Sequence, residues 1–170
     1  MRNIAICAVG ALCLLASCAT QNIKGTDIPD TPQNRAVLEV FFEYVSALKE
    51  KNADKLVALV SESYLDHNGT DDAADDVDYG NIKMFVNSDA YQKIRSVNLF
   101  FIVKDLLLPE GGDTAKILYY YEVRLKTERL APPEEASSIN SPEEKWLKEA
   151  EVNQMVMKKE GEKWKIVSGL

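Results

Sequence analysis

The sequence has little cysteine and almost no histidine. Its 170 residues include three cysteines and one histidine. The cysteines are Cys7, Cys13 and Cys18, so no disulfide framework and no thiolate metal site is available to the rest of the chain. We therefore expect no cofactor and no bound metal, and a domain that is held together by its hydrophobic core.

Positive charge is also scarce. Twenty Lys and Arg residues stand against 27 Asp and Glu residues, which gives a formal net charge of −7. An acidic chain has no electrostatic reason to bind nucleic acid, so we expect no nucleic-acid partner. The sequence also lacks a glycine-rich phosphate loop, a nucleophile elbow and a dinucleotide-binding fingerprint, which makes an enzyme less expected.

Long hydrophobic runs are absent except at the N-terminus. Met1 and Arg2 supply positive charge, and the mostly apolar run 4–16 that follows is shorter than the roughly 20 residues that cross a bilayer. A charged start, a short apolar core and small residues at the end predict a secretory signal over residues 1–17. The sequence Leu15-Ala16-Ser17-Cys18 resembles the bacterial lipobox.

This resemblance implies cleavage between Ser17 and Cys18 and lipidation of the Cys18 thiol. Two or more acyl chains hold a protein stably on a membrane, so the lipid bilayer is the first expected partner. Ala19 is not aspartate, which implies the outer membrane facing the periplasm, although a Gram-positive envelope stays open. The alternative is an ordinary cleaved signal that is followed by a chance cysteine.

The sequence after the signal predicts one domain on a tether. Residues 18–30 are polar and contain Gly25 and Pro29, which predicts a flexible tether. Residues 31–170 have the length of a single domain.

Helical periodicity comes first in that domain. Thr31 and Pro32 are suited to begin a helix. Apolar residues then recur at helical spacing: Val37, Leu38, Phe41, Tyr44, Val45 and Leu48. A second helix is expected from Asn52, a long loop over 64–81, and a third helix over 81–88 with Ile82, Phe85 and Val86 facing inward.

From Ile94 the apolar period changes to two, which indicates strands. The stretch 94–104 is apolar in part on both faces, so we expect it to be a central strand. The clearest strand is 115–126, with Ile117, Tyr119 and Tyr121 on one face. A loop over 130–142 and strands over 146–158 and 164–168 complete an antiparallel sheet. Helices followed by strands indicate an α+β fold.

This element order resembles the nuclear transport factor 2-like fold. The resemblance rests on the two helices, on Tyr64-Leu65-Asp66 after them, and on the final strand Lys163-Trp164-Lys165-Ile166-Val167. It implies N-terminal helices packed on a curved antiparallel sheet that together enclose a cone-shaped pocket. Ketosteroid isomerase and scytalone dehydratase share the fold, which hosts many activities.

Tyr119, Tyr121 and Gln154 are the expected ligand pocket. Tyrosine hydroxyls and an amide among apolar neighbours suit an apolar ligand with few polar groups. The alternative is that these rings simply fill the core.

Tyr64, Asp66 and His67 are a weaker candidate for acid/base chemistry, since histidine near a carboxylate can act as a general base. His67 stands beside a turn at Asn68-Gly69, so we expect it on a surface loop. Asp71, Asp72, Asp75, Asp76 and Asp78 follow, but their spacing does not match the EF-hand pattern, and we predict a solvated acidic loop.

These observations leave three hypotheses. The first is a non-enzymatic envelope lipoprotein that binds a small apolar ligand or an envelope protein. The second is an isomerase- or dehydratase-like enzyme with acid/base groups in the cone. The third is a structural subunit that forms a homodimer through the other sheet face, where Phe100 and Tyr120 are expected.

Overall fold

The computed structural model describes residues 21–127 and 145–170. The expected signal 1–17, Cys18 and Ala19 lie outside the described residues, as does the whole of the expected loop 130–142. Within the described ranges, no helix is long and apolar enough to cross a membrane.

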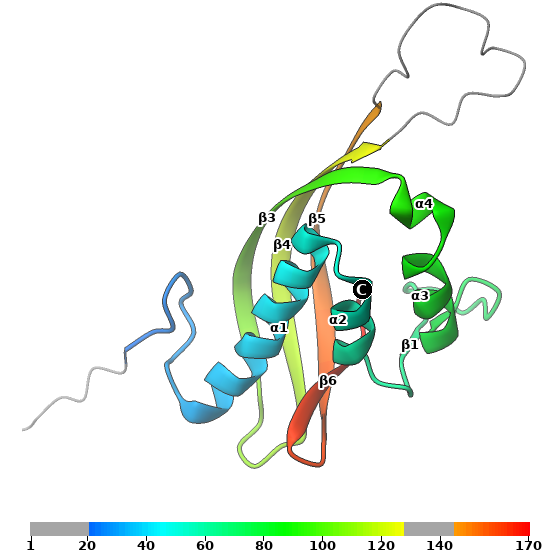
Figure 1. Ribbon diagram of the computed structural model, residues 1–170. Helices are drawn as coiled ribbons and strands as arrows, with labels where there is room; N and C mark the ends of the chain where they lie inside the picture. Colours follow the sequence, from blue (N-terminus) through cyan, green and yellow to red (C-terminus); the bar gives the residue numbers. More distant parts are fainter. Residues whose placement is uncertain (1–20, 128–144) are drawn as a thin grey trace, which may run out of the picture.

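Helices cover one face of a curved four-stranded sheet (Figure 1). The helices are α1 (Pro32–Glu50), α2 (Ala53–Leu59), α3 (Tyr79–Val86) and α4 (Asp89–Gln92). The sheet contains β3 (Ile94–Leu107), β4 (Thr114–Thr127), β5 (Lys145–Glu160) and β6 (Lys163–Ser168), all antiparallel and in the order of the chain. A separate two-stranded sheet pairs β1 (Leu65–Asp66) with β2 (Val77–Asp78). The α+β fold is confirmed.

Local capping explains where α1 begins and ends. The Thr31 side chain accepts the backbone N–H of Asn34, and Pro32 occupies the first turn, where its missing N–H costs nothing. Lys51 closes the helix in the left-handed conformation with φ 55°. Its Nζ donates to the carbonyls of Gln92, at 3.2 Å, and of Ile94, so it ties the end of α1 to the start of β3.

The sheet order corrects one expectation, because β3 is an edge strand and not a central one. The apolar residues on its two faces lie in different environments. Val103 is buried beneath the helices, whereas Phe100, on the opposite face, is 56% exposed.

The face that β5 turns inward was also predicted wrongly. In the β4–β5 register, Ile117 pairs with Met155 and Leu118 pairs with Gln154. Directly paired residues of an antiparallel sheet share a face. Gln154 therefore lies on the exposed face with Leu118, while Met155 is fully buried with Ile117.

The folded part begins earlier than residue 31. The backbone N–H of Ile23 donates to the carbonyl of Ile28 at 2.8 Å, and Asn22 forms an antiparallel β-bridge with Pro29. Ile28 is only 5% exposed and belongs to the main core. Residues 21–30 therefore form a packed turn, which corrects the flexible tether over this stretch, because burial of an isoleucine outweighs the local preference of polar residues for disorder.

The expected loop 64–81 is partly structured. It contains β1 and β2, and α3 begins at Tyr79 behind a capping box in which Asp78 and Asn81 each accept the other's backbone N–H. Helix α4 was not predicted. All described core residues lie between Ile23 and Ile166, so a protein of residues 19–170 contains the whole described core.

Candidate functional site

A cavity of about 400 Å³ lies where α1, α2, α3 and α4 meet. Its wall is mainly apolar and includes Leu48, Leu56, Val60, Ile82, Phe85 and Val86. Val86 is buried and Ile82 is half-buried, in agreement with the inward orientation predicted for them, whereas Phe85 borders the cavity but is 55% exposed. A volume of this size is within the range of small-molecule sites.

The polar groups that border the cavity are few. The lining residues with polar side chains are Tyr44, Asn81 and Tyr91. The Asn81 side-chain oxygen is already engaged, because it accepts the N–H of Asp78 in the cap of α3. Among the described residues, the lining contains no Lys, Arg, His, Asp or Glu side chain.

Tyr91 is the unusual member of this set. It is 4% exposed, and its hydroxyl is buried without a hydrogen-bond partner among the described residues. Buried polar groups are nearly always paired, so a buried hydroxyl without a partner is uncommon. Burial raises the pKa of Tyr91, which keeps the hydroxyl protonated and able to donate.

Tyr44 also faces the interior as a neutral hydroxyl. Desolvation raises its pKa, and the nearby tyrosines, Tyr119 and Tyr64 first among them, raise it further. At neutral pH Tyr44 is therefore a potential hydrogen-bond donor and not a base.

Tyr64 and Asp66 lie deeper than expected, at the end of the last strand. Tyr64 is buried and its hydroxyl donates to Asp66 Oδ2 at 3.2 Å. The same Oδ2 accepts the N–H of Gly169 at 2.6 Å, and Oδ1 accepts the N–H of Asn68 at 3.0 Å. The Tyr64 oxygen in turn accepts the N–H of Leu170 at 3.1 Å. These bonds fasten the end of the chain to the segment after α2.

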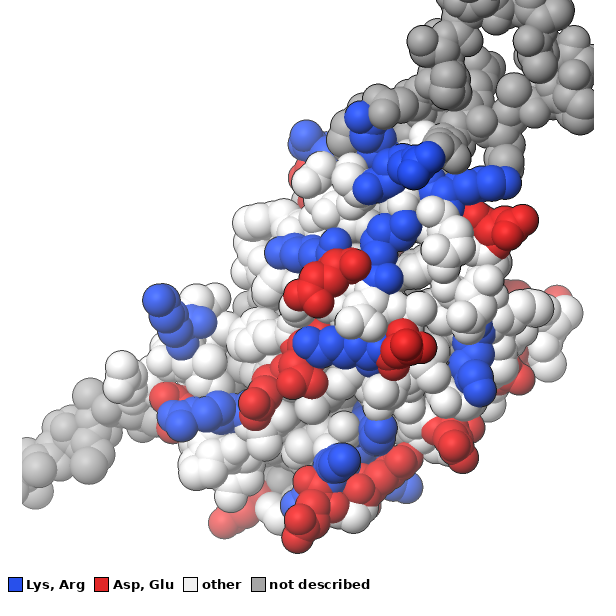
Figure 2. Space-filling model, in the orientation of Figure 1, with Lys and Arg blue, Asp and Glu red and all other residues white. Residues whose placement is uncertain are grey.

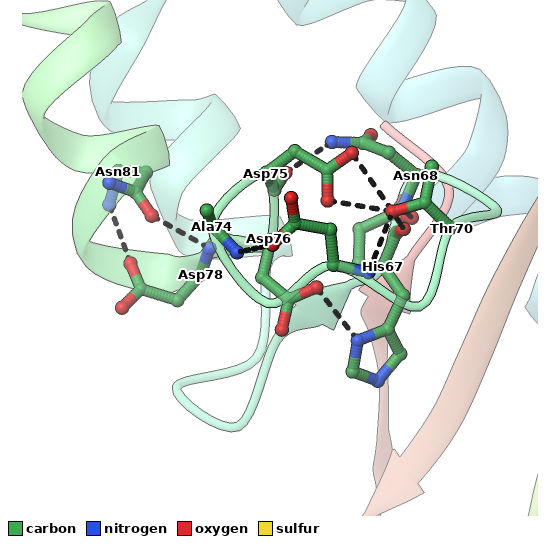
Figure 3. Close-up of polar contacts among 10 residues, drawn as sticks. His67, Asn68, Thr70, Ala74, Asp75, Asp76, Asp78 and Asn81 are labelled. Atoms are coloured by element: carbon green, nitrogen blue, oxygen red, sulfur yellow. Dashed lines mark hydrogen bonds and ion pairs between the residues drawn. The ribbon is translucent and has the colours of Figure 1, made fainter.

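His67 does not join this pair. Figure 3 shows its ring directed at Asp76, and the distance from Nδ1 to Oδ1 is 2.8 Å. The His67 side chain is 63% exposed. The surface-loop position expected for His67 agrees with the structure, and an acid/base triad with Tyr64 and Asp66 is absent.

The acidic loop bonds to itself. Thr70 Oγ1 lies 2.8 Å from Asp75 Oδ1, and Asn68 Nδ2 donates to the carbonyl of Asp75 (Figure 3). No group of three or more His, Cys, Asp or Glu residues in ranges 21–127 and 145–170 is arranged to hold a metal ion.

The expected pocket residues Tyr119, Tyr121 and Gln154 are not brought together. Tyr119 is buried, packs edge-on against Phe41 with ring centroids 5.1 Å apart, and lies with its hydroxyl 3.4 Å from the Gly169 carbonyl. Burial raises the pKa of Tyr119 to about 12. Tyr119 thus fills the core, which was the alternative interpretation.

Tyr121 sits further along the same face, where its hydroxyl lies 3.1 Å from Glu149 Oε1 and 2.9 Å from Glu151 Oε1. Burial and these two carboxylates raise its pKa. Gln154 faces away from the helices, and none of the three borders the cavity between α1 and α3.

The sheet face opposite the helices carries the aromatic residues that were expected to form a homodimer surface. Phe100 and Tyr120 lie on it with ring centroids 6.5 Å apart. Ile102 and Leu118 are each 39% exposed there, and Val152 is 59% exposed. By contrast, acidic and basic side chains are interspersed over the face that carries α1 and α2 (Figure 2).

Sequence reasoning missed Tyr44 and Tyr91 as cavity residues. The helical periodicity of the first helix places Tyr44 in its core stripe. Tyr91 lies on α4, whose four residues are too few to show helical periodicity, although Ser88 is a recognisable N-cap that accepts the N–H of Tyr91 at 3.2 Å.

No protein-family model matches the sequence, and no curated protein matches it. Solved structures do match in fold. A candidate dehydratase of the nuclear transport factor 2-like family from Streptomyces avermitilis is 15% identical with a TM-score of 0.54, over 80% of this chain and 92% of that one. A ketosteroid isomerase-like protein from Erwinia carotovora atroseptica is 11% identical with a TM-score of 0.54, over 81% and 93%.

A hexachlorocyclohexane dehydrochlorinase (LinA) of type 2 is 7% identical with a TM-score of 0.57, over 81% of this chain and 88% of that one. At such low identity these likenesses establish the fold and leave the activity open. The chain has the nuclear transport factor 2-like fold: helices packed on a curved antiparallel sheet.

Proposed function

We propose that this chain is a lipid-anchored protein of the bacterial envelope, located on the outer membrane facing the periplasm, whose domain binds a small apolar ligand without transforming it. The observation that carries the proposal is the apolar cavity of about 400 Å³ between the helices. The lipobox at Leu15–Cys18 supports the anchor, with Cys18 as the lipidated residue.

The side chains that line the cavity favour ligand binding over catalysis. Catalysis of the isomerase or dehydratase type needs an acid or base at the substrate. The lining residues supply tyrosine hydroxyls and one amide, and the elevated pKa of Tyr44 makes it a poor base. Asp66 is the carboxylate among the predicted acid/base candidates, but it does not line the cavity and both of its oxygens accept structural hydrogen bonds.

A fluorescent neutral probe tests the cavity. Residues 19–170 are titrated with N-phenyl-1-naphthylamine, whose emission increases in an apolar site. We expect saturable binding that falls at least about tenfold in Ile82→Trp, because the indole fills the cavity. Met84→Trp is the matched control on the same helix, since Met84 is 68% exposed and does not line the cavity.

Equal binding by both tryptophan variants and the unaltered protein would place the probe elsewhere and contradict the proposal. Absence of saturable binding in all three proteins would contradict it as well.

One observation favours a second candidate, the structural homodimer. The exposed apolar residues on the sheet face, Phe100, Ile102, Leu118, Tyr120 and Val152, form a surface of the kind that associates. Sedimentation equilibrium of residues 19–170 tests it: a dimer that Val152→Lys converts to a monomer supports the candidate, and a monomer at all concentrations contradicts it.

A further inference from the structure

The folded domain begins next to the expected lipidation site. The carbonyl of Gln21 accepts the backbone N–H of Asp30 at 2.6 Å, and the side chain of Asn34, on α1, donates to the carbonyl of Pro29 at 2.9 Å. Ile28 is 5% exposed and fastens this turn to the main core. Gln21, the first residue that the structure describes, is therefore already fixed to the domain.

The connection from Gln21 back to the anchor is short. Only Ala19 and Thr20 separate Gln21 from Cys18. A residue spans at most about 3.6 Å of chain, so the Cα atoms of Cys18 and Gln21 lie within about 11 Å of each other in any conformation. Acyl chains on Cys18 enter the bilayer and hold its sulfur at the headgroups. The turn 21–30 must then lie beside the headgroups, and the domain cannot stand away from the membrane.

The charge of the chain next to the anchor suits this position. Residues 21–35, which comprise the turn and the start of α1, contain two acidic and two basic residues: Asp27, Asp30, Lys24 and Arg35. An Arg35 guanidinium nitrogen lies 2.7 Å from Asp30 Oδ1. This stretch is formally neutral in a chain whose net charge is −7, so a bilayer that contains anionic lipid does not repel it.

The acidic loop lies on the other side of the domain. Residues 71–78 contain five aspartates, of which Asp71, Asp72, Asp75 and Asp78 are exposed. Figure 1 shows the turn 21–30, in blue, on one side, α3 with the loop after β1 on the other, and α1 and α2 between them. Anionic headgroups repel an acidic surface, so the orientation that would bring this loop to the bilayer is disfavoured.

We infer that the domain lies directly on the bilayer surface, with the turn 21–30 and the start of α1 against the lipid headgroups and the acidic loop directed away from them. The inference rests on the proposed function, since it requires an acylated Cys18. The short connection sets the distance between domain and membrane, and the uneven distribution of charge sets the orientation.

Two single-cysteine variants of the full lipidated chain test this orientation. Lys24→Cys places a thiol on the turn and Asp71→Cys places one on the acidic loop, and both residues are exposed. Cys7 and Cys13 leave with the signal and Cys18 is acylated, so a coumarin maleimide labels the introduced thiol. Energy transfer from coumarin to rhodamine-labelled lipid is measured in vesicles of phosphatidylethanolamine and phosphatidylglycerol.

We expect transfer from position 24 to exceed transfer from position 71 at least about threefold, because a domain of this size is about 35–40 Å across and transfer falls steeply with distance. The matched control carries a linker of about 20 glycine and serine residues between Thr20 and Gln21, which reaches about 25 Å. The domain then turns freely, and the two positions should give transfer within about 1.5-fold of each other.

Flotation of the labelled proteins with the vesicles distinguishes the inference from the anchor on which it rests. Protein that floats but gives equal transfer from both positions, or a difference that the linker leaves unchanged, would overturn the inference and leave the lipid anchor in place. Protein that does not float would overturn the anchor and the inference together.

Discussion

Asp66 accepts the backbone N–H of Gly169 at 2.6 Å, although 103 residues separate them in the chain. This bond, with the hydroxyl of Tyr64 on the same carboxylate oxygen, fixes the end of β6 beside the segment after α2. Asp66 therefore has a structural role. Its substitution tests whether the contact between the end of β6 and the segment after α2 stabilises the folded protein.

Asp66→Asn should lower the free energy of unfolding by about 1–3 kcal/mol, because an amide can replace only some of the hydrogen bonds that the carboxylate accepts. Chemical denaturation of residues 19–170 measures the change. Asp71→Asn is the control, since Asp71 is exposed in the acidic loop and its substitution should cost less than about 0.5 kcal/mol. Equal effects of the two substitutions would show that the junction adds no stability.

Gly169→Ala should destabilise the protein more than the loss of glycine alone explains. An added Cβ would lie 2.0 Å from the carbonyl oxygen of Gln154, and φ is +90°. Gly25 also has a positive φ, +83°, but open space around it, so Gly25→Ala isolates the conformational cost of about 1 kcal/mol. The difference in unfolding free energy between the two variants measures the clash, and no difference would refute the close approach.

Stability should decline in alkali through Tyr119. Its pKa is about 12 in the folded protein against 10.0 for the free side chain. The unfolded state therefore loses the proton first, and stability that is complete below pH 10 is lost as the pH rises toward 12. The difference corresponds to about 2–3 kcal/mol. Tyr119→Phe should unfold with a shallower dependence on pH over this window, and an unchanged slope would contradict the assignment.

His67→Ala should leave the unfolding temperature of residues 19–170 within a few degrees. The imidazole is exposed and its pair with Asp76 is open to solvent, and such surface pairs contribute about 0–1 kcal/mol. Tyr64→Phe is the contrast, because it removes a buried hydroxyl that both donates and accepts. A large effect at His67 would mean that the loop has a structural role which its exposure does not suggest.

Cys18→Ser in the full chain should abolish acyl labelling and leave an unprocessed precursor of higher mass. Labelled palmitate and mass spectrometry of the intact protein provide the measurement. Ser17→Ala is a suitable control, since alanine keeps the small side chain that the lipobox pattern requires. Normal processing of the Cys18→Ser protein would show that residues 1–17 are an ordinary signal.

The class of fold followed from the sequence because its periodicities are local. The helical stripe that includes Phe41 and the alternation around Tyr119 each require a buried face, and their order along the chain left an α+β arrangement. The curved sheet under N-terminal helices agrees with the expectation. The position of His67 on a surface loop also followed from its neighbours, Asn68 and Gly69.

Tertiary structure decided the features that local pattern leaves ambiguous. Strand β5 has apolar residues on both of its alternating faces. Only its pairing with β4 therefore determined that Met155 faces the core and Gln154 faces solvent. Ile28 is buried because the chain folds back before α1, and Tyr91 reaches the cavity from a helix too short to show a period. Periodicity reports which residues need burial, whereas the partner that buries them is set by contacts between segments far apart in the chain.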